Sequence, residues 1–285
     1  MSPFTIASLL AELTNASGLP VLELRMLLMY GLNKTRIQLI TQSDAALTGQ
    51  QCDCVQALVA RRQQGEPIAY ILGQREFFGL MLKVTTDVLI PRPDTELLVE
   101  LALQLTPANA ALLDLGTGSG AIAVAVAHQR PDLQVSAADI SAAALEVART
   151  NAALHVCRIA FFHSDWYAGI PQAQWQTIVS NPPYIVLDDA HLSQGDLRFE
   201  PIDALTDHAD GLSAYRQIIQ GAVSRLNGWL LMEHGYDQAA AVRELLRQHG
   251  FSEIQSWRDL AGIERVSGGV LSSATQRRSA VQTGG

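Results

Sequence analysis

The chain has 285 residues, of which 48% are hydrophobic, and this length suggests about two packed domains. No run approaches the roughly 18 consecutive apolar residues that a membrane-spanning helix needs, and the first residues lack the basic start of a signal peptide. A cytoplasmic protein with no membrane partner is therefore expected. The three cysteines, Cys52, Cys54 and Cys157, fit neither a disulfide framework nor a zinc site, so no metal is expected.

The formal net charge of −8 is distributed unevenly along the chain. Residues 1–75 hold six Lys or Arg and five Asp or Glu, a net charge of +1, whereas the remaining 210 residues hold fourteen and twenty-three, a net charge of −9. A domain this acidic repels a phosphate backbone unless a basic stripe compensates. Arg61-Arg62 and Arg277-Arg278 are only short basic pairs, typical of a solvated surface. No direct nucleic-acid partner is therefore expected.

Residues 1–73 are predicted to form a small helical domain. Apolar residues recur at helical spacing in three stretches: Ile6, Leu9, Leu10 and Leu13; Val21, Leu24, Leu27, Leu28 and Leu32; and Val55, Leu58 and Val59 within Gln51–Gln63. None of these residues carries obvious chemistry. Two roles stay open at this point: the domain docks a partner, or it only stabilises the rest of the chain.

Residues 74–90 are predicted to be a β-hairpin linker, because the stretch Phe77–Val88 has the pattern of a short hairpin. The segment Ile90–Glu96 then leads stiffly into a helix, since its two prolines disfavour helix before it. Either Asp94 or Thr95 can cap that helix.

From residue 97 onward, predicted strands and helices alternate. Strands are expected near 111–115, 134–138, 159–163, 176–180, 228–233, 252–257 and 265–271, and helices near 95–105, 119–129, 141–153, 212–225 and 237–249. This order predicts an α/β domain over residues 91–272, with a mainly parallel, doubly wound sheet covered by helices on both faces. Ligands of such sheets bind beyond the C-terminal ends of the strands. Residues 273–285 are expected to be a flexible polar tail.

A glycine-rich loop, Asp114-Leu115-Gly116-Thr117-Gly118-Ser119-Gly120, joins the first of these strands to a helix. Glycines let the backbone approach a nucleotide cofactor, and the helix N-terminus favours negative charge. With Ala121 the loop also satisfies the dinucleotide pattern G-x-G-x-x-A, so an NAD-dependent oxidoreductase stays open. Asp114 favours S-adenosylmethionine instead, because an acid at this place suits a cationic amino acid portion. Asp139, about 20 residues further on, is expected to bind ribose hydroxyls.

The tetrapeptide Asn181-Pro182-Pro183-Tyr184 follows another apolar run. An amide or aromatic amine nitrogen is a poor nucleophile, because its lone pair is delocalised, and a protein can localise that pair by accepting both N–H hydrogens. The side-chain carbonyl of Asn181 and the backbone carbonyl of Pro182 can be these acceptors, and Tyr184 offers a flat face to a planar group. Alone, an Asn-Pro pair is also typical of a turn. Together with the glycine loop and Asp139 it predicts an amino-methyltransferase.

Further motifs lie along the chain: Gly65–Tyr70, Arg75–Phe77, Ile90–Glu96, Ser164–Trp166, Arg198–Pro201 and Glu264–Val266. With the glycine loop and Asn181–Tyr184, they make the chain similar, over about residues 20–270, to the bacterial PrmC/HemK family of protein-(glutamine N5) methyltransferases. Asn-Pro-Pro-Tyr also occurs in adenine methyltransferases, which look different in the Pro-Arg-Pro-Asp-Thr-Glu segment.

The resemblance implies a helical N-terminal domain for substrate docking, a hairpin linker and a seven-stranded, Rossmann-like class I methyltransferase domain. It implies S-adenosylmethionine as cofactor, bound by Gly116, Thr117, Gly118, Ser119, Gly120, Asp139, Asp165, Trp166 and Asn181, with Asp165 receiving the adenine amine. Asn181, Pro182, Pro183 and Tyr184 are then the catalytic and substrate-binding residues. Ser119 stands where the family usually has threonine, and His163 precedes Ser-Asp-Trp. His163 and His234 are interpreted as neighbours of the site, not as bases.

The family's substrate is the glutamine of the Gly-Gly-Gln motif in class I peptide-chain release factors, so the expected reaction is methyl transfer to its amide N5, in support of translation termination, by a monomer. One alternative is an adenine-N6 methyltransferase acting on DNA or RNA, because adenine presents the same planar NH2 group; the acidic balance argues against it. An NAD-dependent oxidoreductase leaves Asn-Pro-Pro-Tyr unexplained. A non-catalytic cofactor-binding scaffold is the third alternative.

Overall fold

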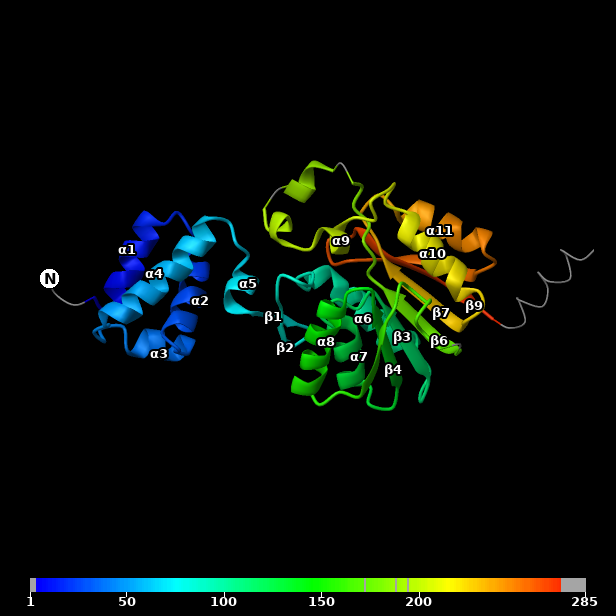
Figure 1. Ribbon diagram of the computed structural model, residues 1–285, viewed down its shortest axis with the longest axis horizontal. Helices are drawn as coiled ribbons and strands as arrows, with labels where there is room; N and C mark the ends of the chain where they lie inside the picture. Colours follow the sequence, from blue (N-terminus) through cyan, green and yellow to red (C-terminus); the bar gives the residue numbers. More distant parts are fainter. Residues whose placement is uncertain (1–3, 172, 188, 194, 273–285) are drawn as a thin grey trace, which may run out of the picture. The chain divides into compact units, whose positions relative to one another are not determined.

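The computed structural model describes residues 4–171, 173–187, 189–193 and 195–272 and divides into two compact units, Met1–Gly73 and Gln74–Gly285 (Figure 1). The predicted tail, 273–285, which includes the pair Arg277-Arg278, lies outside the described residues. Each unit has a hydrophobic core of its own, and each is described by itself below.

The first unit is a helical bundle with elements α1 (Ile6–Ala16), α2 (Val21–Gly31), α3 (Arg36–Thr41), α4 (Gly49–Gln63) and α5 (Ile68–Leu72) (Figure 1). Thr5, Thr35 and Thr48 begin α1, α3 and α4 with capping boxes, which satisfy backbone N–H groups that a helix start leaves unpaired. The apolar residues that predicted the helices form the core, except for Val21, which is exposed. Helices α3 and α5 were not predicted, because six and five residues are too few to show the helical spacing of apolar residues.

The second unit contains a seven-stranded sheet in the order β5-β4-β3-β6-β7-β9-β8. Its strands are β3 (Ala111–Leu115), β4 (Gln134–Asp139), β5 (Ile159–His163), β6 (Trp175–Ser180), β7 (Leu226–Glu233), β8 (Ser252–Arg258) and β9 (Glu264–Leu271). Strands β3 to β7 pair in parallel, while β9 runs antiparallel to both of its neighbours. The chain order reverses between β3 and β6, and ligands of open α/β sheets bind at such a point.

Helices cover both faces of this sheet (Figure 1). One face carries α6 (Glu96–Leu105), α7 (Ala121–Gln129) and α8 (Ala142–Leu154), and the other carries α10 (Ser213–Ala222) and α11 (Ala239–Gln248). Helix α7 is apolar on all sides because residues Ala121 to Ala127 are all buried. The predicted doubly wound α/β fold class is therefore confirmed.

A hairpin of β1 (Gln74–Phe77) and β2 (Leu80–Lys83) opens the second unit. It lies within residues 74–90 and begins three residues before the stretch Phe77–Val88 that showed the hairpin pattern. Its turn residues Phe78 and Gly79 both have positive φ, 52° and 75°, as a type I′ turn requires. Phenylalanine is unusual in this conformation. The N–H of Phe78 donates to Oε1 of Glu96 at 2.9 Å and so ties the hairpin to the start of α6.

The prediction that the side chain of Asp94 or Thr95 caps α6 is wrong. A short 3-10 turn, η1 (Pro93–Thr95), leads into the helix, and the hydroxyl of Thr95 makes no capping hydrogen bond although Thr95 occupies the N-cap position. Asp94 is instead paired with Arg265, at 3.4 Å. Both side chains serve contacts with distant parts of the chain.

Short elements follow β6, where no secondary structure was predicted: η2 (Ala190–Ser193), η3 (Leu197–Phe199) and α9 (Ile202–Leu205). The N–H of Ile185 donates to the carbonyl oxygen of Leu205 at 3.0 Å, which closes this segment into a long loop. The loop lies beyond the C-terminal end of β6.

Candidate active site

A cavity of about 610 Å³ lies beyond the C-terminal ends of β3, β4 and β6. This is within the usual range for a small-molecule site. Its lining comes from the glycine loop, the ends of β4 and β5, residues 181 and 183, the segment 87–95 and the loop 201–214. The lining includes Gly116, Thr117, Gly118, Ser119, Asp139, Ile140, Ser164, Asp165, Trp166, Asn181 and Pro183.

The glycine loop is shaped by three left-handed residues, Gly116, Gly118 and Gly120, with φ of 70°, 55° and 81°. A Cβ at Gly120 would lie 3.0 Å from Cβ of Ala148, so this glycine permits the close approach of α7 to α8. A Cβ at Gly118 would meet nothing within 4 Å, because this residue faces open space. Gly120 does not line the cavity and acts through the shape of the loop.

Asp114 lies beneath the loop and not on the cavity wall. Its Oδ2 accepts from the hydroxyl of Thr117 at 2.6 Å, which fixes the loop to the end of β3. Burial raises the pKa of Asp114 to about 7, and its Oδ1 has no hydrogen-bond partner. The contact of this acid with a cofactor therefore stays a prediction, whereas its role in ordering the loop is directly visible.

Asp139 is the last residue of β4 and lines the cavity. Its carboxylate accepts from the N–H of Gly118 at 2.8 Å through Oδ2, and from the N–H of Ser141 at 2.9 Å through Oδ1. Each oxygen keeps a further lone pair for a ligand. Burial raises the pKa of Asp139, and the backbone hydrogen bonds act in the opposite direction.

Asp165 and Trp166 line the cavity beside the end of β5. Trp166 has a φ of 45°, which a bulky side chain rarely adopts, and Oγ of Ser164 donates to its carbonyl oxygen at 2.8 Å. Strained backbone of this kind persists where surrounding contacts impose it, often at functional sites. His163, directly before, has Nε2 at 2.8 Å from the carbonyl oxygen of Ile140 and so supports the loop after β4.

Of the Asn-Pro-Pro-Tyr residues, Asn181 and Pro183 lie on the cavity wall. Nδ2 of Asn181 donates to Oγ1 of Thr95 at 3.2 Å. Pro182 is buried, and Tyr184 packs against the core beside α10 and α11, so neither is among the lining residues. Burial raises the pKa of Tyr184 to about 12. The catalytic roles of these four residues stay predictions.

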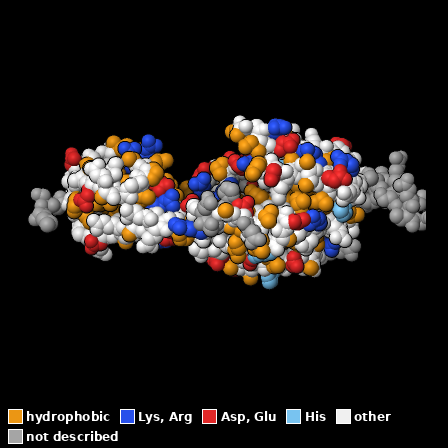
Figure 2. All heavy atoms as spheres, turned by 90° about the horizontal axis from the view of Figure 1, so that it is seen from above, with side chains coloured by type: hydrophobic (Ala, Val, Ile, Leu, Met, Phe, Trp, Pro, Cys, Tyr) orange, Lys and Arg blue, Asp and Glu red, His pale blue; other side chains and the backbone are white. Residues whose placement is uncertain are grey.

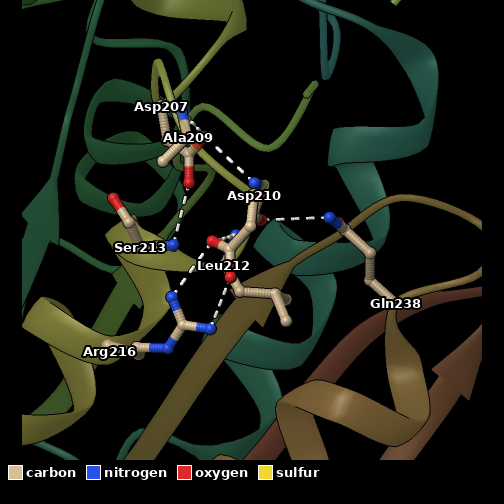
Figure 3. A network of polar contacts seen from close by, with 8 residues as sticks. Asp207, Ala209, Asp210, Leu212, Ser213, Arg216 and Gln238 are labelled. Carbon is tan, nitrogen blue, oxygen red and sulfur yellow. Dashed lines mark hydrogen bonds and ion pairs between the residues drawn. The ribbon is translucent and has the colours of Figure 1, made fainter. Parts of the chain in front are cut away.

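The loop before α10 is held by a network of polar contacts (Figure 3). The carboxylate of Asp207 accepts from the N–H groups of Ala209, Gly211 and Ser213 at 3.0, 3.0 and 2.8 Å. Nε2 of Gln238 donates to the carbonyl oxygens of Gly211 and Tyr184 at 3.0 and 3.1 Å. Asp207 lines the cavity but is already engaged, and Gln238 fastens the end of Asn-Pro-Pro-Tyr to this loop.

An ion pair connects the segment 87–95 of the cavity wall to the loop that precedes α9. Glu200, whose side chain is fully buried, pairs with Arg92, and its Oε2 accepts from the N–H of Ile90 at 3.0 Å. These bonds join the Pro-Arg-Pro-Asp-Thr-Glu and Arg-Phe-Glu-Pro motifs, which are far apart in the sequence. Burial raises the pKa of Glu200, while Arg92 acts against the rise.

Other groups of the described residues do not form a second site. His234 is buried, with its ring nitrogens 2.8 Å from the carbonyl oxygen of Gly235 and from Oγ of Ser267, and burial lowers its pKa. Among residues 4–171, 173–187, 189–193 and 195–272, no group of three or more His, Cys, Asp or Glu side chains could hold a metal. No helix in that part of the chain is long and apolar enough to cross a membrane.

Comparison with known proteins places the chain in a family. Residues 6–73 match the PrmC N-terminal domain and residues 93–194 match the methyltransferase small domain. A release factor glutamine methyltransferase of Bordetella pertussis is 53% identical over 269 residues, 93% of this chain and 100% of the relative. That of Neisseria gonorrhoeae is 52% identical over 260 residues, 90% of this chain and 95% of the relative. The chain belongs to the release factor glutamine methyltransferase family. It is therefore an enzyme of the methyltransferase class, as the sequence predicted.

Solved structures of low identity share the fold of the methyltransferase domain. A methyltransferase from Pyrococcus furiosus has a TM-score of 0.52 and 19% identity, covering 73% of this chain and 94% of that chain. The hMettl16 catalytic domain has a TM-score of 0.56 and 14% identity, covering 76% and 81%. At this identity they support the class I methyltransferase fold and nothing further about the reaction.

The sequence does not show the role of four residues that support the methyltransferase site: Thr95, Glu200, Glu233 and Gln238. Each makes at least one contact with a residue more than 25 positions away, as in the 3.2 Å bond between Thr95 and Asn181. Thr95 and Glu200 lie within motifs of the family, but a motif alone does not say what a side chain touches. Only the fold brings these residues together.

Proposed function

We propose that this enzyme transfers a methyl group from S-adenosylmethionine to the side-chain amide N5 of the glutamine in the Gly-Gly-Gln motif of class I peptide-chain release factors, in the cytoplasm and as a monomer. The observation that carries the proposal is the position of Asn181 and Pro183 on the wall of the cavity that the glycine loop and Asp139 also line. The names of the relatives at 52–53% identity agree with this substrate.

The cavity residues fit S-adenosylmethionine. Gly118 presents its backbone to open space, and the carboxylate oxygens of Asp139 keep lone pairs for ribose hydroxyls. Trp166 offers an aromatic face, and Asp165 can accept from an exocyclic amine. The carboxyl group of Asp114 is buried beneath the loop, and its ionised form favours a cationic ligand.

A calorimetric titration tests the cofactor assignment. Asp139→Ala removes a charge-assisted acceptor, which is worth roughly 1.5–3 kcal/mol, so the Kd for S-adenosylmethionine should rise by about ten- to a hundredfold. Turnover at saturating cofactor should change less. Asp132→Ala is the matched control, because Asp132 is an acid paired with Arg130 outside the cavity lining. Equal affinities of wild type and Asp139→Ala would assign the ribose to another residue.

The reaction requires alignment more than a strong base. Bound S-adenosylmethionine supplies a methyl group that its sulfonium already activates. Oδ1 of Asn181 and the carbonyl oxygen of Pro182 accept the two hydrogens of the glutamine NH2 and localise the nitrogen lone pair. The nitrogen becomes acidic once alkylated, so its proton can leave to water. His163 and His234 are both engaged with backbone carbonyls and are not needed as bases.

A protein substrate suits the charge of the molecule better than nucleic acid does. The residues after position 75 carry a net charge of −9, and a phosphate backbone would be repelled without a basic stripe. On the face drawn in Figure 2, basic side chains are scattered among acidic and apolar ones.

We propose the first unit as the part that docks the release factor.

Mass spectrometry of a purified release factor tests the function. After incubation with enzyme and S-adenosylmethionine, the peptide that contains Gly-Gly-Gln should gain one methyl group, about 14 Da, on the glutamine. A release factor with Asn in place of that glutamine should gain none, and an adenine-containing oligonucleotide should stay unmodified. Methylation of the oligonucleotide but not of the release factor would overturn the proposal.

A further inference from the structure

Asn181 can act as an acceptor only if its side-chain amide is turned the right way. The carboxamide carries an oxygen and an NH2 group of nearly the same shape, and only the oxygen accepts the hydrogens of a substrate amide. Asn181 lines the cavity, so the side of its amide that faces the protein decides which group faces the substrate. Two buried residues lie there, Thr95 at 5% exposure and Glu233 at 3%.

The contacts of these two residues are specific. Nδ2 of Asn181 donates to Oγ1 of Thr95 at 3.2 Å. Glu233 is the last residue of β7, and hydrogen bonding from the side chains of Thr95 and Asn181 favours the charged form of its carboxyl group and lowers its pKa. Burial raises the pKa of Glu233 to about 7, and these hydrogen bonds act against the rise. Oε2 of Glu233 has no partner, so the carboxylate has accepting capacity to spare.

The direction of each hydrogen bond follows from the carboxylate. An ionised carboxylate can only accept, so the single hydroxyl hydrogen of Thr95 points to Glu233 and a lone pair of Oγ1 faces Asn181. Both groups next to the Asn181 amide are then acceptors. The NH2 group satisfies them, whereas the opposite orientation would bring oxygen against oxygen and leave buried acceptors unpaired.

We propose that Thr95 and Glu233 are positioning residues that hold Asn181 with its carbonyl oxygen toward the cavity, and that they thereby make the enzyme select an amide over a carboxylate. This inference rests on the proposed function, because it assigns a substrate amide to the cavity. Both residues are assigned a role that acts through Asn181 and not through contact with the substrate nitrogen.

The neighbouring contacts support this role. The hydroxyl of Thr95 does not cap α6, although Thr95 occupies the N-cap position, so it is available to the network. The adjacent Asp94 pairs with Arg265 of β9 at 3.4 Å, which fixes the segment that carries Thr95. Oη of Tyr215 donates to the backbone oxygen of Glu233 at 3.0 Å and fixes the end of β7. Both positioning residues are thus held from outside the network.

Steady-state kinetics at pH 8 with an intact release factor test the positioning role. Thr95→Val and Glu233→Gln should each lower kcat by roughly ten- to a hundredfold, because misplacing a reacting group by about 1 Å costs this much. The Kd for S-adenosylmethionine should stay within about twofold of wild type in both variants. Thr95→Ser keeps the hydroxyl and should keep most of the wild-type kcat.

Thr177→Val is the matched control for loss of a buried threonine hydroxyl. Thr177 lies on β6 four residues before Asn181, is fully buried, and its hydroxyl pairs with that of Thr106 at 2.9 Å, away from the cavity lining. It should leave kcat unchanged. A fall in kcat as large as that of Thr95→Val would show that the effect is only structural.

A release factor with Glu in place of the Gly-Gly-Gln glutamine tests the selectivity. Used as a competitive inhibitor, this Glu variant should have an inhibition constant for wild type several-fold higher than that of a release factor with Asn at the same position. The reason is that the Asn181 oxygen repels the carboxylate. In Glu233→Gln the neighbouring amide can also donate, so Asn181 can turn and the difference should shrink to about one. A purely structural role for Glu233 would leave this ratio as in wild type.

The outcomes separate the inference from the function on which it rests. If wild type does not methylate the release factor, the proposed function fails. If wild type is active and both Thr95→Val and Glu233→Gln match it in kcat and in the selectivity ratio, only the positioning role fails. If Glu233→Gln does not bind the cofactor, Thr95→Val compared with Thr95→Ser and Thr177→Val decides alone.

Discussion

At the scale of single residues, the site is built on buried acids whose charge is costly. Burial raises the pKa of Asp114 and of Glu233 to about 7, whereas the exposed Asp210, paired with Arg216, has its pKa lowered. Ionisable groups whose pKa values are shifted by burial cluster at functional sites. Asp114 orders the glycine loop, and Glu233 lies behind Asn181.

The pKa of Glu233 predicts how stability changes with pH. Its folded-state value, about 7, is above its ordinary 4.5, so the folded state binds this proton more tightly and stability falls as pH rises between these values. Glu233→Gln removes that slope. Relative to wild type, its free energy of unfolding should gain about 2 kcal/mol between pH 5.5 and pH 8.

Urea unfolding followed by tryptophan fluorescence measures this difference, because Trp166, Trp175, Trp229 and Trp257 all lie in the second unit. Asp114 titrates in the same range but is present in both proteins, so its contribution cancels. A difference that does not change with pH would mean that Glu233 has an ordinary pKa in the folded protein.

Asn181→Ala should remove most methyl transfer and leave cofactor binding largely intact. The variant loses one positioned acceptor in the reacting geometry, which costs on the order of 3 kcal/mol, or about a hundredfold in kcat. Single-turnover kinetics together with calorimetry of S-adenosylmethionine would separate the two effects. Near-normal kcat in a folded variant would remove Asn181 from the catalytic residues.

At the scale of elements, short sequence patterns predicted the strands and the site loops, because these depend on neighbouring residues. All seven strands of the large sheet lie where the sequence indicated them. For the central parallel strands β3, β4, β6 and β7 the reason is that a parallel strand covered on both faces is largely apolar. The site loops were predicted in the same way, from glycines and polar residues at strand ends. The cap of α6 was not, because Thr95 is recruited by Asn181 across 86 residues of sequence.

The segment between Tyr184 and α10 shows a second limit. Its short turns η2, η3 and α9 contain three to four residues each, too few for any period to be visible. The segment is held by long-range bonds: Leu205 accepts from the N–H of Ile185, and Glu200 accepts from the N–H of Ile90. Gln238 joins its two ends through the carbonyl oxygens of Tyr184 and Gly211. The architecture of this wall of the cavity therefore depends on the complete fold.

Gly211→Ala tests that wall. Gly211 has a φ of 75°, and a Cβ there would lie 2.7 Å from the carbonyl oxygen of Tyr184 and 2.9 Å from Nε2 of Gln238. The substitution should lower kcat by pushing Tyr184 away from the loop that contains Gly211.

Gly262→Ala is the matched control, because Gly262 has a φ of 80° with nothing within 4 Å of its Cβ. The control should lose only roughly 1–2 kcal/mol of stability, from backbone strain, and keep its kcat. Equal kcat values in both variants, in a release-factor assay, would show that the contact does not matter for turnover.

At the scale of the whole molecule, chemistry and charge divide between the two units. Every residue of the cavity lining belongs to the second unit, and the first has a separate core of leucines and valines. Residues 1–75 are nearly neutral, whereas the rest of the chain carries a net charge of −9. Sequence patterns predicted the helices of the first unit, because its apolar core residues recur at helical spacing. These core residues say nothing about which partner the surface of the unit binds.

A chain that begins at Gln74 tests whether the first unit docks the release factor. It should still bind S-adenosylmethionine with wild-type affinity, because the glycine loop, Asp139, Asp165 and Trp166 all lie beyond it. It should methylate an intact release factor far more slowly, mainly through a higher KM, since remote contacts supply the binding energy that offsets the cost of positioning the glutamine. A short Gly-Gly-Gln peptide cannot make those contacts and should be an equally poor substrate for both forms. If the shortened enzyme binds the cofactor and methylates the whole release factor at the full-length rate, the first unit is a stabilising domain only.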